Sequence, residues 1–308
     1  MLRYIARRLF YMLIALFIII TVTWFISKLL PGTPFADEKL SDESRAQLFA
    51  KYGLDEPLLV QYGKYMLNVL HGDLGNSYYF QGRPVTQIVL DRLPVSAFLG
   101  VQAVLIGLVT GLVLGIVAAL RHNSVWDSLA TVLAVLGVSV PSFVLGPILQ
   151  YWLGLKLGWF PIAFFESWWH SVLPSLALSV FVTSQVARFI RAEILEVMGQ
   201  DYVTLARAKG LSGLAVVVRH VLRNALIPLV TVLAPLTIYI VTGSLVVEQI
   251  FSVPGIGEQF VRSIVVNDYA MILGTTIFFS VLFISALLIQ DILYGIIDPR
   301  IRVSGAKE

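Results

Sequence analysis

Long uncharged apolar runs dominate the chain, and short polar segments separate them. After a basic N-terminus, an uncharged and mostly apolar run extends to Ser27. A bilayer span needs about 20 apolar residues, so this run predicts a first transmembrane helix within residues 1–30. The apolar core of a signal peptide is shorter. Further apolar runs predict spans at about residues 93–120, 128–155, 171–190, 224–247 and 270–297. The predicted fold is an all-α polytopic membrane protein with six transmembrane helices.

The sizeable polar segment lies between the first two spans, at residues 31–92. Its positive and negative charges nearly balance, and aromatic residues such as Tyr52, Tyr62 and Tyr65 recur along it. Ser41 before two acidic residues is typical of a helix start. We expect short helices packed into a small external subdomain, with a loose loop as the alternative, followed by a membrane-spanning core at residues 93–308.

Composition and charge support a membrane protein with a defined orientation. The chain is 57% hydrophobic and only 13% charged, whereas soluble domains carry about 25% charged residues. Arginine and lysine are concentrated at the N-terminus and between the fourth and fifth predicted spans. The positive-inside rule then predicts cytoplasmic N- and C-termini in a plasma membrane. Cysteine is absent, which excludes disulfides and thiol chemistry, and no pattern suggests nucleic-acid binding.

Glycine and proline occur at regular or isolated positions within the predicted spans. Gly107, Gly111 and Gly115 repeat at every fourth residue, and small residues at this spacing let helices pack closely in lipid. Pro141 interrupts the third span and predicts either a packing kink or a break that lines a water-filled path. As candidates for lining such a path we select polar or helix-breaking positions, namely Ser139, Pro141, Ser175, Thr183 and Thr242.

The longest basic interruption of the second half is the stretch from Asp201 to Pro228. Asp201 suits a helix start, and Gly210 suits a helix end. A second helix is expected to follow, with one apolar stripe, which consists of Leu214, Val217, Val218, Val221, Leu222 and Ala225. Such a short helix with a glycine corner can dock on a partner protein. Alternatively, the stretch is an ordinary basic loop that lies on anionic lipid.

These residues resemble a known motif. The run from Ala206 to Leu211, together with the later Arg219-His220 and the segment from Arg223 to Pro228, resembles the cytoplasmic loop of ATP-binding-cassette importer permeases, in the form found in the peptide and nickel branch. Thr204-Leu205-Ala206 stands where the general loop has Glu-Ala-Ala, and Pro228 lies further from the glycine.

Other segments extend the resemblance over nearly the whole chain. They are Pro31-Gly32-Thr33-Pro34-Phe35, Gly137 to Phe143, Thr242 to Gly257 and Asp291 to Arg300. The external segment is similar to that of oligopeptide permeases, where it faces the substrate-binding protein.

The resemblance implies a coupling loop and a set of partners. The residues that would contact an ATPase subunit are Thr204, Leu205, Ala206, Arg207, Ala208, Lys209, Gly210 and Leu211. The implied partners are a homologous second permease, two ATPases that bind ATP and Mg²⁺, and an external peptide-binding protein. The implied substrate is an oligopeptide, with a dipeptide or nickel as the alternative within the family.

Some chemistry is absent from the sequence. No P-loop occurs, so we expect no ATP binding by this chain, and the four histidines lack the spacing of metal ligands. No hydrolase motif occurs, so no catalytic residue is predicted. A stand-alone secondary transporter, the rival from another class, needs charged residues within its spans, and these are almost missing.

Overall fold

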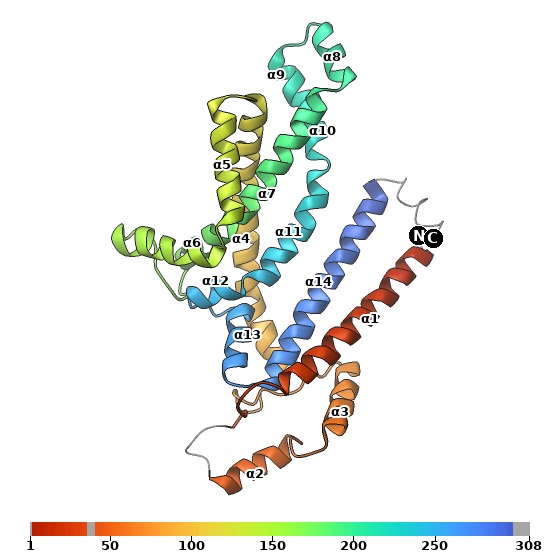
Figure 1. The fold of residues 1–308 in the computed structure, drawn as a ribbon, viewed down its shortest axis with the longest axis vertical. Coiled ribbons are helices and arrows are strands. Elements are labelled where there is room, and N and C mark those ends of the chain that lie inside the picture. Colours follow the sequence, from red (N-terminus) through yellow and green to blue (C-terminus); the bar gives the residue numbers. More distant parts are fainter. Residues whose placement is uncertain (1, 36–40, 298–308) are drawn as a thin grey trace. The chain divides into compact units, whose positions relative to one another are not determined.

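The computed structural model describes residues 2–35 and 41–297. In these residues the chain is helical and forms no β-strand, only an isolated bridge between Asn76 and Pro84 (Figure 1). The chain divides into two compact units. Unit 1 comprises Met1–Pro94 and Gly255–Ser285, and unit 2 comprises Val95–Pro254 and Ala286–Glu308.

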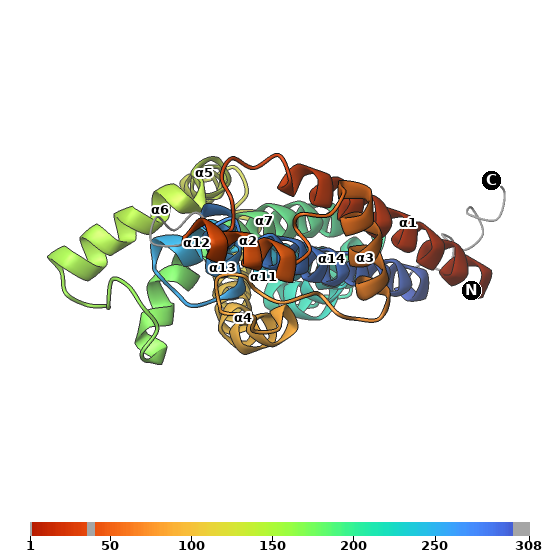
Figure 2. The ribbon, with the colours of Figure 1, turned by 90° about the horizontal axis from the view of Figure 1, so that it is seen from below.

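Unit 1 gathers the N-terminal helices around two segments from later in the chain. Its helices are α1 (Leu2–Ser27), α2 (Asp42–Lys51), α3 (Leu58–Leu70), the start of α4 (Val85–Leu120), α13 (Ile256–Val265) and most of α14 (Tyr269–Ile297). α3 lies beside the end of α1 (Figures 1 and 2). There the Tyr62 hydroxyl is 2.8 Å from the Thr21 hydroxyl, and its ring meets Trp24 edge-on at 5.3 Å.

The core of unit 1 forms where α4 begins. Val85, Ile88, Ile256 and Met271 are buried together there. A Cβ on Gly274 would lie 2.4 Å from Cγ1 of Val85, so α4 and α14 pack too closely for any side chain at that position. Nearby, Phe35 stacks on Tyr52 at 5.7 Å, and Tyr52 meets Tyr78 at 4.8 Å.

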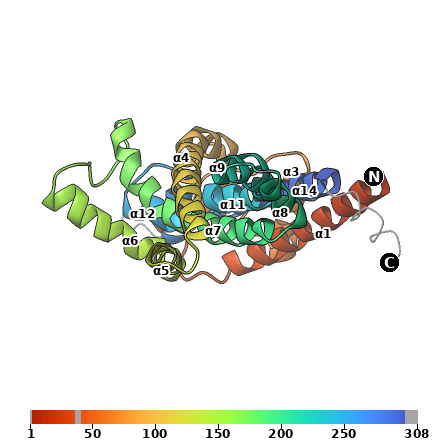
Figure 3. The same ribbon diagram turned by 90° about the horizontal axis from the view of Figure 1, so that it is seen from above.

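Unit 2 contains the greater part of α4, the end of α14 and all the helices between α4 and α13. The helices between α4 and α13 are α5 (Val125–Ser139), α6 (Ser142–Leu149), the π-helix η1 (Gln150–Lys156), the 3₁₀ turn η2 (Trp168–Ser171), α7 (Val172–Met198), α8 (Asp201–Ala208), α9 (Gly213–Val216), the π-helix η3 (Val217–Leu222), α10 (Arg223–Leu226), α11 (Leu229–Gly243) and α12 (Leu245–Ile250). α4, α5 and α7 run side by side (Figures 1 and 3). α7 carries the largest share of the core, including Leu173, Val182, Val186 and Ile190.

The glycine repeat brings α4 and α7 into backbone contact. A Cβ on Gly107 would lie 2.8 Å from the carbonyl oxygen of Ser179, and one on Gly111 would lie 2.7 Å from that of Thr183. A Cβ on Gly115 would likewise lie 2.7 Å from the carbonyl oxygen of Ala187. The close helix packing predicted from this spacing is therefore confirmed.

Among the residues that the structure describes, four helices are long and apolar enough to cross a membrane. They are Ala6–Ser27 of α1, Val85–Leu120, Trp168–Met198 and Tyr269–Ile289 of α14. The predicted spans at 1–30, 93–120, 171–190 and 270–297 overlap these helices. α4 starts before the predicted span, so the last residues assigned to the external segment are helical.

The third predicted span is not one straight helix. α5 and the segment from Ser142 to Lys156 are bent by 102° at their junction, so at most five spans result if this pair counts as one. Val140 adopts an extended conformation, with φ −90° and ψ 114°. Proline at the next position disfavours the helical conformation of its predecessor, so Pro141 breaks the span where the sequence predicted a kink or a break.

The fifth predicted span, residues 224–247, is also interrupted. α10 ends at Leu226, α11 covers only Leu229–Gly243, and α12 restarts at Leu245. Pro228 lies at the first junction and Pro235 within α11. Proline lacks the N–H that an α-helix needs at interior positions, which accounts for the interruption at Pro228, and the span at 224–247 stays a prediction.

Candidate functional site

α8 and α9 form a tip at the end of unit 2, where they extend beyond the ends of α4 and α5 (Figure 1). α8 begins after Gln200, and Asp201 lies in its first turn, where its charge complements the helix dipole. Gly210 has φ +81° and its N–H donates to the carbonyl of Arg207 at 2.9 Å. The predicted helix start and glycine end are therefore confirmed.

The tip exposes nearly all the residues that resemble a coupling loop. In α8, Val203 and Ala206 are buried and hold the helix against unit 2. The other members of the predicted set are exposed, namely Thr204, Leu205, Arg207, Ala208, Lys209, Gly210 and Leu211. The exposed surface combines two basic side chains with the apolar side chain of Leu205, and such a mixture suits a protein–protein contact.

The helix that follows the tip differs from the predicted amphipathic helix. Leu214 and Val218 are 76% and 53% exposed, although the predicted stripe included both. The buried positions are Val216, Val221 and Ala225, which are separated by five and then four residues. The π-helix η3 spans Val217–Leu222, and its wider turn shifts the buried face by one residue. A constant helical period does not reproduce this shift.

A side-chain contact ties α8 to the helix that returns into the bundle. The Asn224 amide Nδ2 donates to the Tyr202 hydroxyl at 3.1 Å and to the His220 carbonyl at 2.8 Å. α8 is therefore attached at two places, because it also follows α7 after the short turn at Gly199-Gln200. A force on the tip would reach both α7 and α10.

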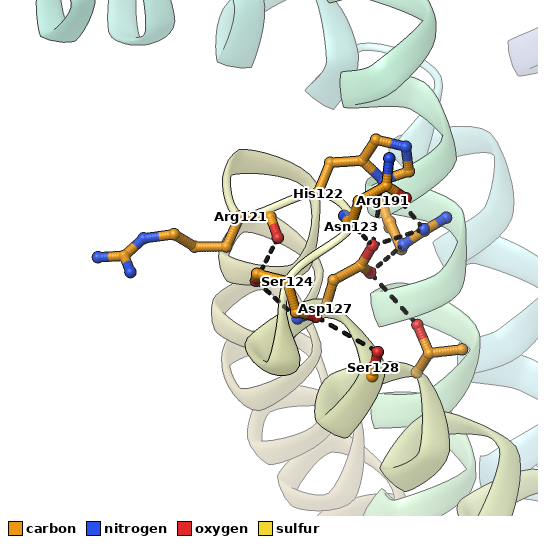
Figure 4. Close-up of polar contacts among 8 residues, drawn as sticks. Arg121, His122, Asn123, Ser124, Asp127, Ser128 and Arg191 are labelled. Atoms are coloured by element: carbon orange, nitrogen blue, oxygen red, sulfur yellow. Dashed lines mark hydrogen bonds and ion pairs between the residues drawn. The ribbon is translucent and has the colours of Figure 1, made fainter.

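A charged cluster around the buried Asp127 lies at the same end of unit 2, between the α4–α5 turn and α7 (Figure 4). Arg191 of α7 donates from Nε to Oδ1 of Asp127 at 2.7 Å and from Nη2 to Oδ2 at 2.9 Å. Asn123 N donates to Oδ2 at 3.0 Å, and His122 Nδ1 lies 3.1 Å from the same oxygen. We call these four residues the Asp127 clamp.

The clamp fixes the turn between two spans to α7. Asp127 is 5% exposed, and a bidentate arginine–carboxylate pair is both strong and directional. Ser124 caps α5 by accepting from the backbone N–H of Asp127.

Sequence reasoning missed this pair. A serine three residues before an aspartate indicates a helix start, but it does not indicate a partner 64 residues away.

The candidate path residues lie in different surroundings. Ser175 is buried and donates to Gln102 Oε1 at 3.0 Å, and the Thr183 hydroxyl lies 2.7 Å from that of Thr110. Both therefore take part in the contact between α4 and α7. Ser139 and Pro141 are exposed at the bend. Thr242 lies in α11, and its side chain is outside the described residues.

Comparison with known proteins identifies the family. Residues 111–303 match the family described as binding-protein-dependent transport system inner membrane component, and residues 1–100 match the N-terminal region of such components. The chain belongs to this family. It is thus a multi-pass inner membrane component of a transport system.

Relatives of this family align over nearly the full length. The chain is 43% identical to the dipeptide transport system permease protein DppB of Lactococcus lactis over 98% of this chain and 100% of the relative. It is 38% identical to the oligopeptide transport system permease protein OppB of Escherichia coli, again over 98% and 100%.

A solved structure supports the fold. A crystal structure of an amino acid ABC transporter with histidines matches 70% of this chain and 94% of its own, with a TM-score of 0.53 and 18% identity. At that identity the likeness supports a shared helical permease fold alone.

Proposed function

We propose that this chain is the membrane-spanning subunit of an ATP-binding-cassette importer that carries peptides into the cell. Membership of the binding-protein-dependent family supports a transport subunit. Similar permeases are named for dipeptide and for oligopeptide transport, so the proposed substrate class is peptides without a fixed length. These names favour peptides over nickel, the other substrate that the sequence left open.

In the proposed orientation both termini and the tip lie in the cytosol. Arg207, Lys209, Arg219 and Arg223 are all exposed on or just after the tip, and basic residues are retained on the cytoplasmic side of membrane proteins. The external segment, residues 31–92, would then face a peptide-binding protein.

The observation that carries the proposal is the exposed α8 on an attached support. In our proposal the ATPase partner binds the exposed residues from Thr204 to Leu211, with Ala206 as their anchor in unit 2. ATP and Mg²⁺ bind to the ATPase subunits and not to this chain. Closure of the ATPase pair would push on α8, and the attachment through Asn224 and Tyr202 would convey the movement to α10.

The proposed substrate path runs between this chain and a homologous second permease. Alternating access would result when the helices pivot about the bend at Pro141. Ser139, Pro141, Ser175, Thr183 and Thr242 remain the candidates for residues along that path. Selection of the peptide is assigned to the external binding protein.

An uptake experiment with charge reversal at the tip tests the proposal. Arg207→Glu should lower uptake of a labelled peptide at least about tenfold. The new negative charge would face a partner surface that binds a positive one, and such a mismatch costs about 1.4 kcal/mol or more of binding free energy. Gly210→Pro should act in the same direction, since proline cannot adopt a positive φ. Co-purification of the ATPase subunits should fall in parallel, at an unchanged amount of permease in the membrane.

Arg121→Glu is the matched control, because Arg121 is exposed at the same end of unit 2 but lies on the α4–α5 turn. We expect near-normal uptake and ATPase association for this variant. Normal uptake by both tip variants would disprove the docking role of α8. Uptake that continues without any ATPase subunit would instead support a secondary transporter.

A further inference from the structure

A cavity of about 190 Å³ lies among α4, α5 and α7, at the end that carries the Asp127 clamp. Its wall includes Gly115 and Ala118 of α4, Ala130 and Thr131 of α5, and Arg188 and Arg191 of α7. α4 ends at Leu120 and α5 begins at Val125, so the cavity lies within the last turns of apolar helices. It adjoins the expected level of the lipid headgroups.

The cavity combines an apolar wall with a basic side chain, that of Arg188. Arg191 is held by both oxygens of Asp127, so their charges compensate each other. Arg188 lies one turn earlier on α7 and is exposed. Within residues 2–35 and 41–297 no carboxylate forms an ion pair with it. The charge that remains at the cavity is therefore positive.

We propose that this cavity binds an anionic phospholipid, with the phosphate at Arg188 and part of an acyl chain along the small residues of α4 and α5. Pockets for complete small molecules measure about 300 Å³ or more, so this cavity admits only part of a lipid. A basic residue at the end of a groove between membrane helices is suited to an anionic headgroup. The inference goes beyond the transport function proposed above.

The position gives the lipid a way to influence the tip. α7 contributes both arginines of the cavity and leads through Gly199-Gln200 directly into α8. A bound lipid would stabilise one arrangement of α4, α5 and α7 near the clamp. In the proposed orientation this lipid belongs to the inner leaflet.

Native mass spectrometry of the full chain in mild detergent tests the proposal. The protein is titrated with phosphatidylglycerol or with phosphatidylcholine of the same acyl chains, and bound lipids are counted. We expect the wild type to prefer phosphatidylglycerol. Arg188→Gln should weaken that binding about fivefold, because one basic residue near a lipid surface contributes about that factor. The same substitution should leave the binding of phosphatidylcholine unchanged.

Two matched controls define the site. Arg121→Gln should retain lipid, because the Arg121 side chain points away from the clamp (Figure 4). Val135→Phe should lower binding, because Val135 lines the cavity, whereas Val132→Phe on the same helix should not. Equal binding of both lipids by the wild type would overturn the proposal. So would an equal loss of phosphatidylglycerol binding in Arg121→Gln and Arg188→Gln.

Discussion

Two buried aspartates, one in each unit, join segments that are far apart in the sequence. Asp268 in unit 1 accepts from the Ser77 hydroxyl and from the backbone N–H groups of Tyr78, Tyr79 and Met271, the latter three at 3.2, 3.2 and 3.3 Å. All of these donors are neutral.

Asp127 in unit 2 is instead paired with a cation. Arg191 donates to both of its oxygens, and His122 lies beside one of them. Asp268 is 1% exposed and Asp127 5%, so burial alone does not distinguish the two. The nature of the donors does, because losing Asp127 leaves a charge without its partner, whereas losing Asp268 leaves only neutral donors unpaired.

The largest effect is expected for Asp127→Ala. Removing one partner of a buried ion pair costs 3–5 kcal/mol, and the partial exposure of Arg191 places this case at about 3 kcal/mol. Unfolding of the purified chain in a sodium dodecyl sulfate titration measures the loss. In the double variant Asp127→Ala/Arg191→Ala the loss should be smaller than the sum of the two single losses. Additive losses would contradict a clamp.

A smaller effect is expected for Asp268→Asn. The amide keeps one acceptor oxygen but turns an N–H₂ group towards N–H donors of unit 1, which costs about 2 kcal/mol. The same titration measures it, with Asp73→Asn as the control, because Asp73 is exposed and makes one local hydrogen bond to Gly75. A loss as large as that of Asp127→Ala would remove the distinction between neutral and charged partners.

The smallest effect concerns alkaline pH. Burial, and then the negative charge of Asp268, raise the pKa of Tyr78 above its usual value of 10.0. A raised pKa in the folded state stabilises the protein fully below the ordinary pKa, and this contribution is lost as the pH rises above it.

Stability should therefore fall above about pH 10, by up to about 1.4 kcal/mol for each further pH unit. Tyr78→Phe should reduce this fall, whereas Tyr151→Phe, at an exposed position, should leave it unchanged. Unfolding titrations at about pH 8 and about pH 11 measure the difference. An identical fall in stability in Tyr78→Phe and wild type would show that the pKa of Tyr78 does not contribute to the pH dependence.

Local patterns in the sequence predicted much of the helical fold. Apolar run length predicted the membrane helices, the spacing of Gly107, Gly111 and Gly115 predicted the α4–α7 contact, and Asp201 with Gly210 predicted the bounds of α8. Each of these features depends on residues within a few turns of one another. Pro141 predicted a disturbance, but the 102° bend depends on packing around it.

The long-range pairs could not be predicted in the same way. The partner of Arg191 lies 64 residues away, and Ser77 and Asp268 are separated by 191 residues. No period in a single sequence indicates such a partner. The π-helix η3 was missed for another reason, since it changes the period itself. The coupling role of the exposed residues around Arg207 stays a prediction.

The π-helix also bears on the direction in which the tip points. Each residue of an α-helix turns the chain by about 100°, and η3 holds one residue more than regular winding would need. Deleting a single residue between Val217 and Leu222 would restore regular winding and leave the tip in place, whereas the same deletion in a helix without the extra residue would rotate everything beyond it by about 100°. The orientation of the tip thus depends on where along the chain a residue is removed.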